Sequence, residues 1–150
     1  MQLEILSALV CFVVTVNAAG CPLGFVHHKR SCYWFSVVKG SFAEAHAYCQ
    51  YLEGHLATIE SRDEDLFVRG HARRHGKAHH YWLGGTDLNI EGKWMWEGQR
   101  RFSFTNWYHR QPDNAGHREH CLEIRKHFSH YLWNDWICSH NLNFICEKKL

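Results

Sequence analysis

The sequence predicts a single α+β domain, with helices in the first half of the chain and short strands in the second half. Two Ser-x-x-Glu pairs open helical patterns between residues 41 and 70, and short aromatic runs separated by turn residues begin at residue 81. Elements segregated in this way are typical of α+β domains. The 150 residues are sufficient for one domain, and no repeat or linker divides them.

The N-terminal segment has the pattern of a secretory signal peptide. From Ile5 to Val16 it is almost wholly apolar, and the small residues Ala18, Ala19 and Gly20 follow. The apolar stretch is too short to span a bilayer. We expect a signal peptide over residues 1–19, with cleavage after Ala18, Ala19 or Gly20 left open. No later apolar stretch is long enough to cross a membrane, so we expect a secreted, extracellular protein.

The cysteines support an oxidising environment. Of the seven, Cys11 lies in the predicted signal. An even set remains: Cys21, Cys32, Cys49, Cys121, Cys138 and Cys146. We interpret them as disulfides rather than as a metal or redox site, since no C-x-x-C pair is present. Six cysteines allow fifteen pairings, among which the spacing alone does not choose.

The first half of the chain contains a hairpin and two helices. Residues 21–25 and 32–35 indicate two short strands. The first helix begins after Ser41, which forms a capping box with Glu44, and Gly54 ends it. Its apolar face comprises Phe42, Ala45, Cys49 and Leu52. Ser61 and Glu64 open a second helix that we expect to weaken at Gly70.

The second half contains short strands around a long loop. Strands are predicted at residues 81–85, 93–96, 121–124, 131–137 and 143–147. Residues 97–120 show no periodicity, and loops of that length are usually functional or disordered. Glu97 and Glu123 are expected at the surface. Most tryptophans are expected in the core, namely Trp34, Trp82, Trp94, Trp96, Trp133 and Trp136. Trp107 lies in the long loop and has a better chance of contacting a ligand than the other six tryptophans, although burial in the core is favoured for Trp107 too.

The charge pattern argues against nucleic acid. The formal net charge is only +2, and basic residues concentrate in one run: Arg73, Arg74, His75, Lys77, His79 and His80. This footprint is too weak for nucleic-acid binding. A solvated loop is the favoured interpretation of the run, and an anion- or mineral-binding patch is the alternative.

Oxygen-bearing side chains cluster around Cys121 and Cys138 and predict a metal site. They are Gln111, Asp113, Glu119, Asn134 and Asp135. Hard cations such as Ca²⁺ prefer oxygen donors and take six to eight of them, which leaves coordination positions for a ligand. The pattern therefore favours binding over catalysis. The His-Arg-Glu-His run at residues 117–120 lacks the spacing of zinc hydrolases, so we do not expect an enzyme.

Together these motifs resemble a C-type lectin domain over residues 21–147. The resemblance is carried by the motifs Trp82-Leu83-Gly84-Gly85, Gln111-Pro112-Asp113, Glu119 before Cys121, Trp133-Asn134-Asp135 and the cysteine order. It implies two helices, small antiparallel sheets and a long ligand-binding loop. It also implies the disulfides Cys21–Cys32, Cys49–Cys146 and Cys121–Cys138.

The resemblance assigns the five oxygen-bearing residues to one Ca²⁺, whose coordination sugar hydroxyls complete. It also implies a cis peptide bond before Pro112. The Gln-Pro-Asp order is similar to galactose-type members of the family, whereas mannose-type members carry Glu-Pro-Asn. Galactose-type members usually place a stacking Trp shortly afterwards, where this chain has residues 114–116, Asn-Ala-Gly. His117 or Tyr108 could substitute for it.

An auxiliary Ca²⁺ site of the family is only partly matched. Asp87 and Glu91 fill its acidic positions and Glu119 would be shared, but Asn114 and His120 stand where carboxylates are customary. The loss of two charges should weaken that site.

Within the family the chain is similar to the perlucin group of mollusc shell-matrix lectins. This similarity implies a shell-matrix component that contacts matrix glycans and promotes calcium carbonate nucleation. The alternatives are a soluble innate-immune lectin that recognises microbial glycans, and a lectin-like domain that has lost sugar binding.

Overall fold

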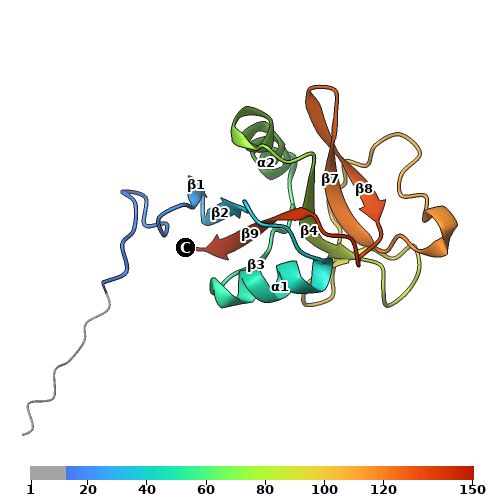
Figure 1. Cartoon of the computed structure of the whole chain (residues 1–150), viewed down its shortest axis with the longest axis horizontal. Coiled ribbons are helices and arrows are strands. Elements are labelled where there is room, and N and C mark those ends of the chain that lie inside the picture. Colours follow the sequence, from blue (N-terminus) through green and yellow to red (C-terminus); the bar gives the residue numbers. More distant parts are fainter. Residues whose placement is uncertain (1–12) are drawn as a thin grey trace, which may run out of the picture.

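The computed structural model describes residues 13–150 (Figure 1). Most of the predicted signal peptide, residues 1–12, lies outside the described residues. An N-terminal hairpin is present as β1 (Val26–His28) and β2 (Ser31–Phe35), which pair antiparallel. The position predicted for its first strand, residues 21–25, is wrong, because that segment is a turn that precedes β1. Within residues 13–150, no helix combines the length and apolar composition needed to cross a membrane.

Helix α1 (Phe42–Tyr51) begins and ends where the sequence predicts. The Ser41 hydroxyl accepts a hydrogen bond from the backbone N–H of Glu44 at 3.2 Å, which satisfies one free donor of the first turn. Ala45 and Cys49 are completely buried. The helix packs against β3, β4 and β9, so its apolar face closes one side of the sheet.

Helix α2 (Arg62–His75) is longer than predicted, because it continues through Gly70. A glycine in a helix costs about 1 kcal/mol relative to alanine. Val68 and Ala72, on either side of it, are buried in the core, and this burial outweighs the cost. The last turn carries basic side chains that complement the helix dipole. The first part of the basic run, predicted as a loop, is therefore helical.

Within residues 13–150, nine strands form one connected sheet rather than separate small sheets. The remaining strands are β3 (His55–Leu56), β4 (His80–Thr86), β5 (Met95–Trp96), β6 (Arg100–Arg101), β7 (Cys121–His127), β8 (His130–Trp136) and β9 (Asn143–Lys149). β9 pairs antiparallel with β2 and β3 but parallel with β4, and this parallel pair joins the two halves. In Figure 1, α1 and α2 lie on opposite sides of β9.

The disulfide pairing implied by the resemblance is confirmed. Cys21 bonds to Cys32, Cys49 to Cys146 and Cys121 to Cys138. The second of these ties α1 to β9 in the core. The third joins the start of β7 to the chain just after β8, and it brackets the predicted metal ligands of β8.

Tryptophans dominate the core beneath the long loop. Trp82, Trp96 and Trp133 are at most 2% exposed, whereas Trp34 and Trp136 are half-buried. Trp107 packs edge-on against Trp133 at 5.8 Å between ring centroids. Trp107 is half-buried against the core, so the burial favoured for it is only partly realised. The loop itself is not structureless, since it contains β6 and a short 3₁₀ turn, η1 (Ala115–His117).

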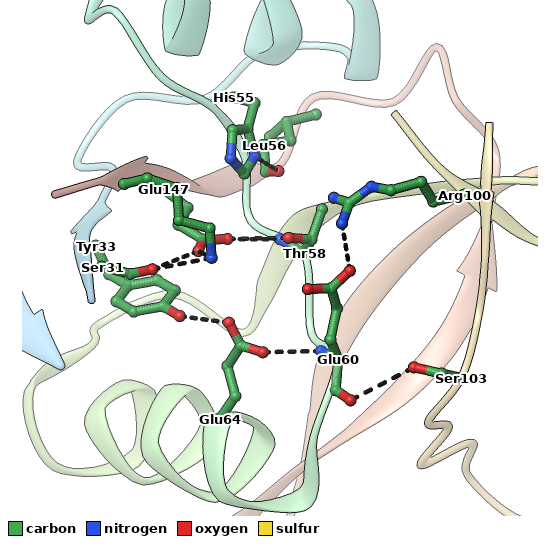
Figure 2. A network of polar contacts seen from close by, with 11 residues as sticks. Ser31, Tyr33, His55, Leu56, Thr58, Glu60, Glu64, Arg100, Ser103 and Glu147 are labelled. Carbon is green, nitrogen blue, oxygen red and sulfur yellow. Dashed lines mark hydrogen bonds and ion pairs between the residues drawn. The ribbon is translucent and has the colours of Figure 1, made fainter. Parts of the chain in front are cut away.

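A buried carboxylate, Glu147 on β9, organises the other end of the sheet (Figure 2). It accepts hydrogen bonds from the Ser31 hydroxyl at 2.7 Å and from the Thr58 backbone N–H and hydroxyl, both at 3.1 Å. Burial raises the pKa of Glu147, but these donors and Lys149 outweigh it, so the pKa lies below its ordinary value. The ionised group thus links β2, β9 and the segment before α2.

Candidate metal and ligand site

The long loop is fixed to β8 before it reaches the predicted ligands. The backbone N–H of Tyr108 donates to the Trp133 carbonyl at 2.8 Å, and the Trp133 N–H donates to the Asn106 carbonyl at 3.2 Å. The Trp133 indole N–H also donates to the buried carboxylate of Asp65 on α2 at 2.8 Å. The loop therefore starts from a rigid base in the core.

Three of the predicted ligands converge as one acidic cluster. Ligand oxygens of Asp113, Glu119 and Asp135 all lie within 4.8 Å of one another. Asp135 is completely buried and accepts from the backbone N–H groups of Asp113 at 3.2 Å and Asn114 at 2.7 Å. Glu119 accepts from the Ala115 N–H at 3.3 Å. These bonds hold the loop over β8, with Glu119 and Asp135 buried and Asp113 exposed.

The electrostatics of the cluster favour a cation. Burial, followed by the charges of Asp135 and Asp113, raises the pKa of Glu119 to about 7. Burial also raises the pKa of Asp135, although backbone N–H donors partly counteract it. Carboxylates that repel one another in a partly dry site are stabilised by a bound cation, which supplies the missing positive charge.

Two amides complete the predicted ligand set. The Oε1 atom of Gln111 is buried and has no hydrogen-bond partner among the described residues, and such an orphaned acceptor is costly unless something binds it. The peptide bond between Gln111 and Pro112 is cis, as the resemblance implies. Asn134 donates through Nδ2 to Glu123 at 2.9 Å and to the Asp135 carbonyl at 2.7 Å. Its oxygen is therefore the atom left for a cation. The donor set fits Ca²⁺, which prefers carboxylate and amide oxygens.

The surface position predicted for Glu123 is wrong, whereas Glu97 is exposed as predicted. Glu123 is completely buried on β7 and accepts from Asn134 and from His80 Nδ1, the latter at 2.7 Å. Strand β7 lies between β4 and β8, which pair with both of its edges, so it is an interior strand of the sheet. Glu123 thus orients one of the ligands, and only knowledge of the strand order could have revealed this role.

The auxiliary acidic positions form a second cluster around a histidine. Asp87, Glu91 and His120 bring their ligand atoms within 4.8 Å of one another. His120 Nδ1 lies 3.1 Å from Asp87 Oδ1 and 3.2 Å from Glu91 Oε2. Asn114 connects this cluster to the first: its Nδ2 donates to Glu91 at 2.9 Å and its Oδ1 accepts from the Glu119 N–H at 3.0 Å.

The two candidates for a sugar-stacking surface differ in their surroundings. The Tyr108 ring stacks on His127 with centroids 4.0 Å apart, so one of its faces is already covered. His117 is exposed at the end of η1 and has a positive φ of 57°. His117 is therefore the more accessible ring beside the acidic cluster.

Comparison with known proteins identifies the family. The model of the lectin C-type domain matches residues 38–148. Perlucin from Haliotis laevigata is 62% identical over 130 residues, covering 87% of this chain and 84% of perlucin. The galactose-specific lectin nattectin from Thalassophryne nattereri is 33% identical, covering 88% of this chain and 82% of nattectin. The chain also matches asialoglycoprotein receptor 2 of Rattus norvegicus but spans only 49% of its length.

Solved structures agree with this assignment. The carbohydrate-recognition domain of the mouse scavenger receptor C-type lectin superposes with a TM-score of 0.77 at 33% identity. The superposition covers 86% of this chain and 96% of that domain. The chain belongs to the C-type lectin domain family.

Proposed function

We propose that this member of the C-type lectin domain family is a secreted, Ca²⁺-dependent carbohydrate-binding protein. One observation carries the proposal: three carboxylates converge within 4.8 Å, and the buried Oε1 atom of Gln111, two residues before Asp113, has no partner among residues 13–150. The residues that would hold Ca²⁺ are Gln111, Asp113, Glu119, Asn134 and Asp135. The bound ion would supply coordination positions at which vicinal sugar hydroxyls replace water.

The protein's own contribution is to place these oxygens in advance. Asp135 fixes the backbone of the loop, and Glu123 turns the amide of Asn134 so that its oxygen is available. Side chains that hold an ion can also accept hydrogen bonds from the sugar, and bonds to a charged acceptor are stronger than neutral ones. Ordered ligands reduce the entropy that binding must overcome.

A galactose-type sugar is the favoured ligand, and mannose is the alternative. The Gln-Pro-Asp order at residues 111–113 supports galactose, and so does the similarity to a relative named as galactose-specific. No Trp follows the motif, so we assign the stacking contact to His117. Replacing His117 with Ala should weaken galactose binding without changing Ca²⁺ affinity, since His117 is not part of the acidic cluster.

The test is calorimetric titration with Ca²⁺, followed by retention on immobilised galactose or mannose and release by a chelator. Glu119→Gln should abolish retention. Glu97→Gln makes the same chemical change at an exposed position and should retain full binding. Sugar binding that survives chelation would contradict the proposal, as would the absence of Ca²⁺ affinity at millimolar concentration.

The similarity to perlucin supports a role in the organic matrix of shell. There the domain would contact matrix glycans and calcium carbonate mineral and promote nucleation. Detection of the protein in acid extracts of shell would support this role. Expression confined to blood cells, with binding to microbial glycans, would instead indicate an immune lectin.

A further inference from the structure

A cavity lies apart from the acidic cluster. It has a volume of about 700 Å³ and opens beside the start of β4, and none of the five proposed Ca²⁺ ligands lines it. Cavities of this size accommodate small organic ligands. The proposed lectin activity does not use this cavity.

The lining of the cavity has one sign of charge. Among the residues that the structure describes, five basic side chains line it and no carboxylate does: Lys39, His75, Lys77, His79 and His80. They come from the loop after β2, the end of α2, the following loop and the start of β4. The sequence placed four of these residues in one basic run, and the fold adds Lys39 from a distant segment.

Part of this charge has a structural explanation. His75, like Arg73 and Arg74, lies in the last turn of α2, where cations complement the helix dipole. His80 is held by Glu123. The two exposed lysines, Lys39 and Lys77, are not explained by the helix dipole, because they lie outside α2. Pairing with a carboxylate does not explain them either, because Lys39 and Lys77 form no ion pair within the described residues.

The environment beside the cavity is electropositive. The pKa of His71, on the helix that ends at the cavity, is lowered by burial and further by the charges of His75 and Arg74. A bound anion would relieve this repulsion among like charges. Apolar side chains, namely Phe35, Ala78 and Leu142, also line the cavity. Such a lining suits the carbon skeleton of a ligand better than a bare ion.

We propose that this cavity binds a sulfated saccharide, with Lys39 and Lys77 contacting the sulfate and the apolar side chains contacting the sugar ring. Sulfate accepts charge-assisted hydrogen bonds from lysine ammonium groups. The site requires no metal. It therefore gives the domain a second glycan contact, chemically distinct from the Ca²⁺-dependent one.

The test measures binding of a sulfated heparin oligosaccharide to the full chain in the presence of a chelator. A desulfated oligosaccharide of the same length and inorganic sulfate serve as comparison probes. Lys39→Gln/Lys77→Gln should weaken binding by about five- to tenfold and reduce its salt dependence. Lys93→Gln/Arg101→Gln removes the same charge at exposed positions outside the cavity and should change affinity less than about twofold.

Each outcome decides the matter. Equal losses in the two double variants would show attraction by net charge and overturn the site. Equal binding of the desulfated probe would overturn the role of sulfate, and equally tight binding of inorganic sulfate would overturn the saccharide. Because the chelator removes the Ca²⁺-dependent activity, failure here leaves the lectin proposal intact. Failure of Ca²⁺ binding likewise leaves this site standing.

Discussion

Protonation of Glu119 should control Ca²⁺ affinity near neutral pH. The pKa of its carboxyl is raised from 4.5 to about 7 by burial and by the charges of Asp135 and Asp113. A cation needs the ionised form, so Ca²⁺ must displace a proton whenever the pH lies below that value. Apparent affinity should therefore fall about tenfold between pH 8 and pH 6.

The same pKa predicts the pH dependence of stability without Ca²⁺. Because the pKa is higher in the folded than in the unfolded state, the folded chain binds more protons between pH 4.5 and about 7, and stability falls as the pH rises through that window. A pKa raised this far corresponds to roughly 3 kcal/mol at most. Glu119→Gln should thus be more stable than the wild type at pH 8 by up to that amount and equal to it near pH 4.5.

Calorimetry provides the assay. Titrations at pH 6 in two buffers of different ionisation enthalpy should show release of nearly one proton per Ca²⁺, and at pH 8 almost none. Glu97→Gln, at an exposed position, should behave like the wild type. Wild-type affinity that is equal within about twofold at pH 6 and pH 8, with no proton release, would refute the reasoning.

Three further substitutions test neighbouring parts of the structure. His120→Asp replaces the ring between two carboxylates with a third carboxylate, and titration should then reveal an additional Ca²⁺. Glu123→Gln should lower Ca²⁺ affinity about tenfold with unchanged circular dichroism, because Glu123 orients Asn134. Glu147→Gln should lower the free energy of unfolding by about 2 kcal/mol at pH 7. In urea titrations that deficit should shrink below pH 4.5, since the lowered pKa of Glu147 stabilises the fold only while the group is ionised.

Local signals predicted local structure well. The Ser41 and Ser61 caps form the hydrogen bonds that their sequence pattern predicts. Short sequence motifs predicted Asp113, Glu119 and Asp135 as ligands of one ion, and the structure brings these three carboxylates together. The error at Gly70 has a different origin: helix propensity is a local quantity, whereas the burial of Val68 and Ala72 depends on strands far along the chain.

Long-range pairing was not readable from the sequence. The parallel contact between β4 and β9 joins residues about sixty positions apart, and no periodicity encodes it. Glu123, which sequence reasoning placed at the surface, is buried on β7, a strand paired with both β4 and β8. The cationic cavity has the same origin, because Lys39 reaches the basic run only once β2 and β4 are both placed against β9.

The loop that carries the proposed Ca²⁺ ligands is cross-linked without an auxiliary ion. Asn114 bonds to Asp135, Glu119 and Glu91 through its backbone N–H, its Oδ1 and its Nδ2 respectively. His120 in turn contacts Glu91 and Asp87. An amide and an imidazole therefore occupy the two positions where the resemblance implies carboxylates, and both side chains form direct hydrogen bonds there. We therefore expect the geometry of the proposed Ca²⁺ site to persist without an ion at the auxiliary position, because Asn114 and His120 supply hydrogen-bond donors there.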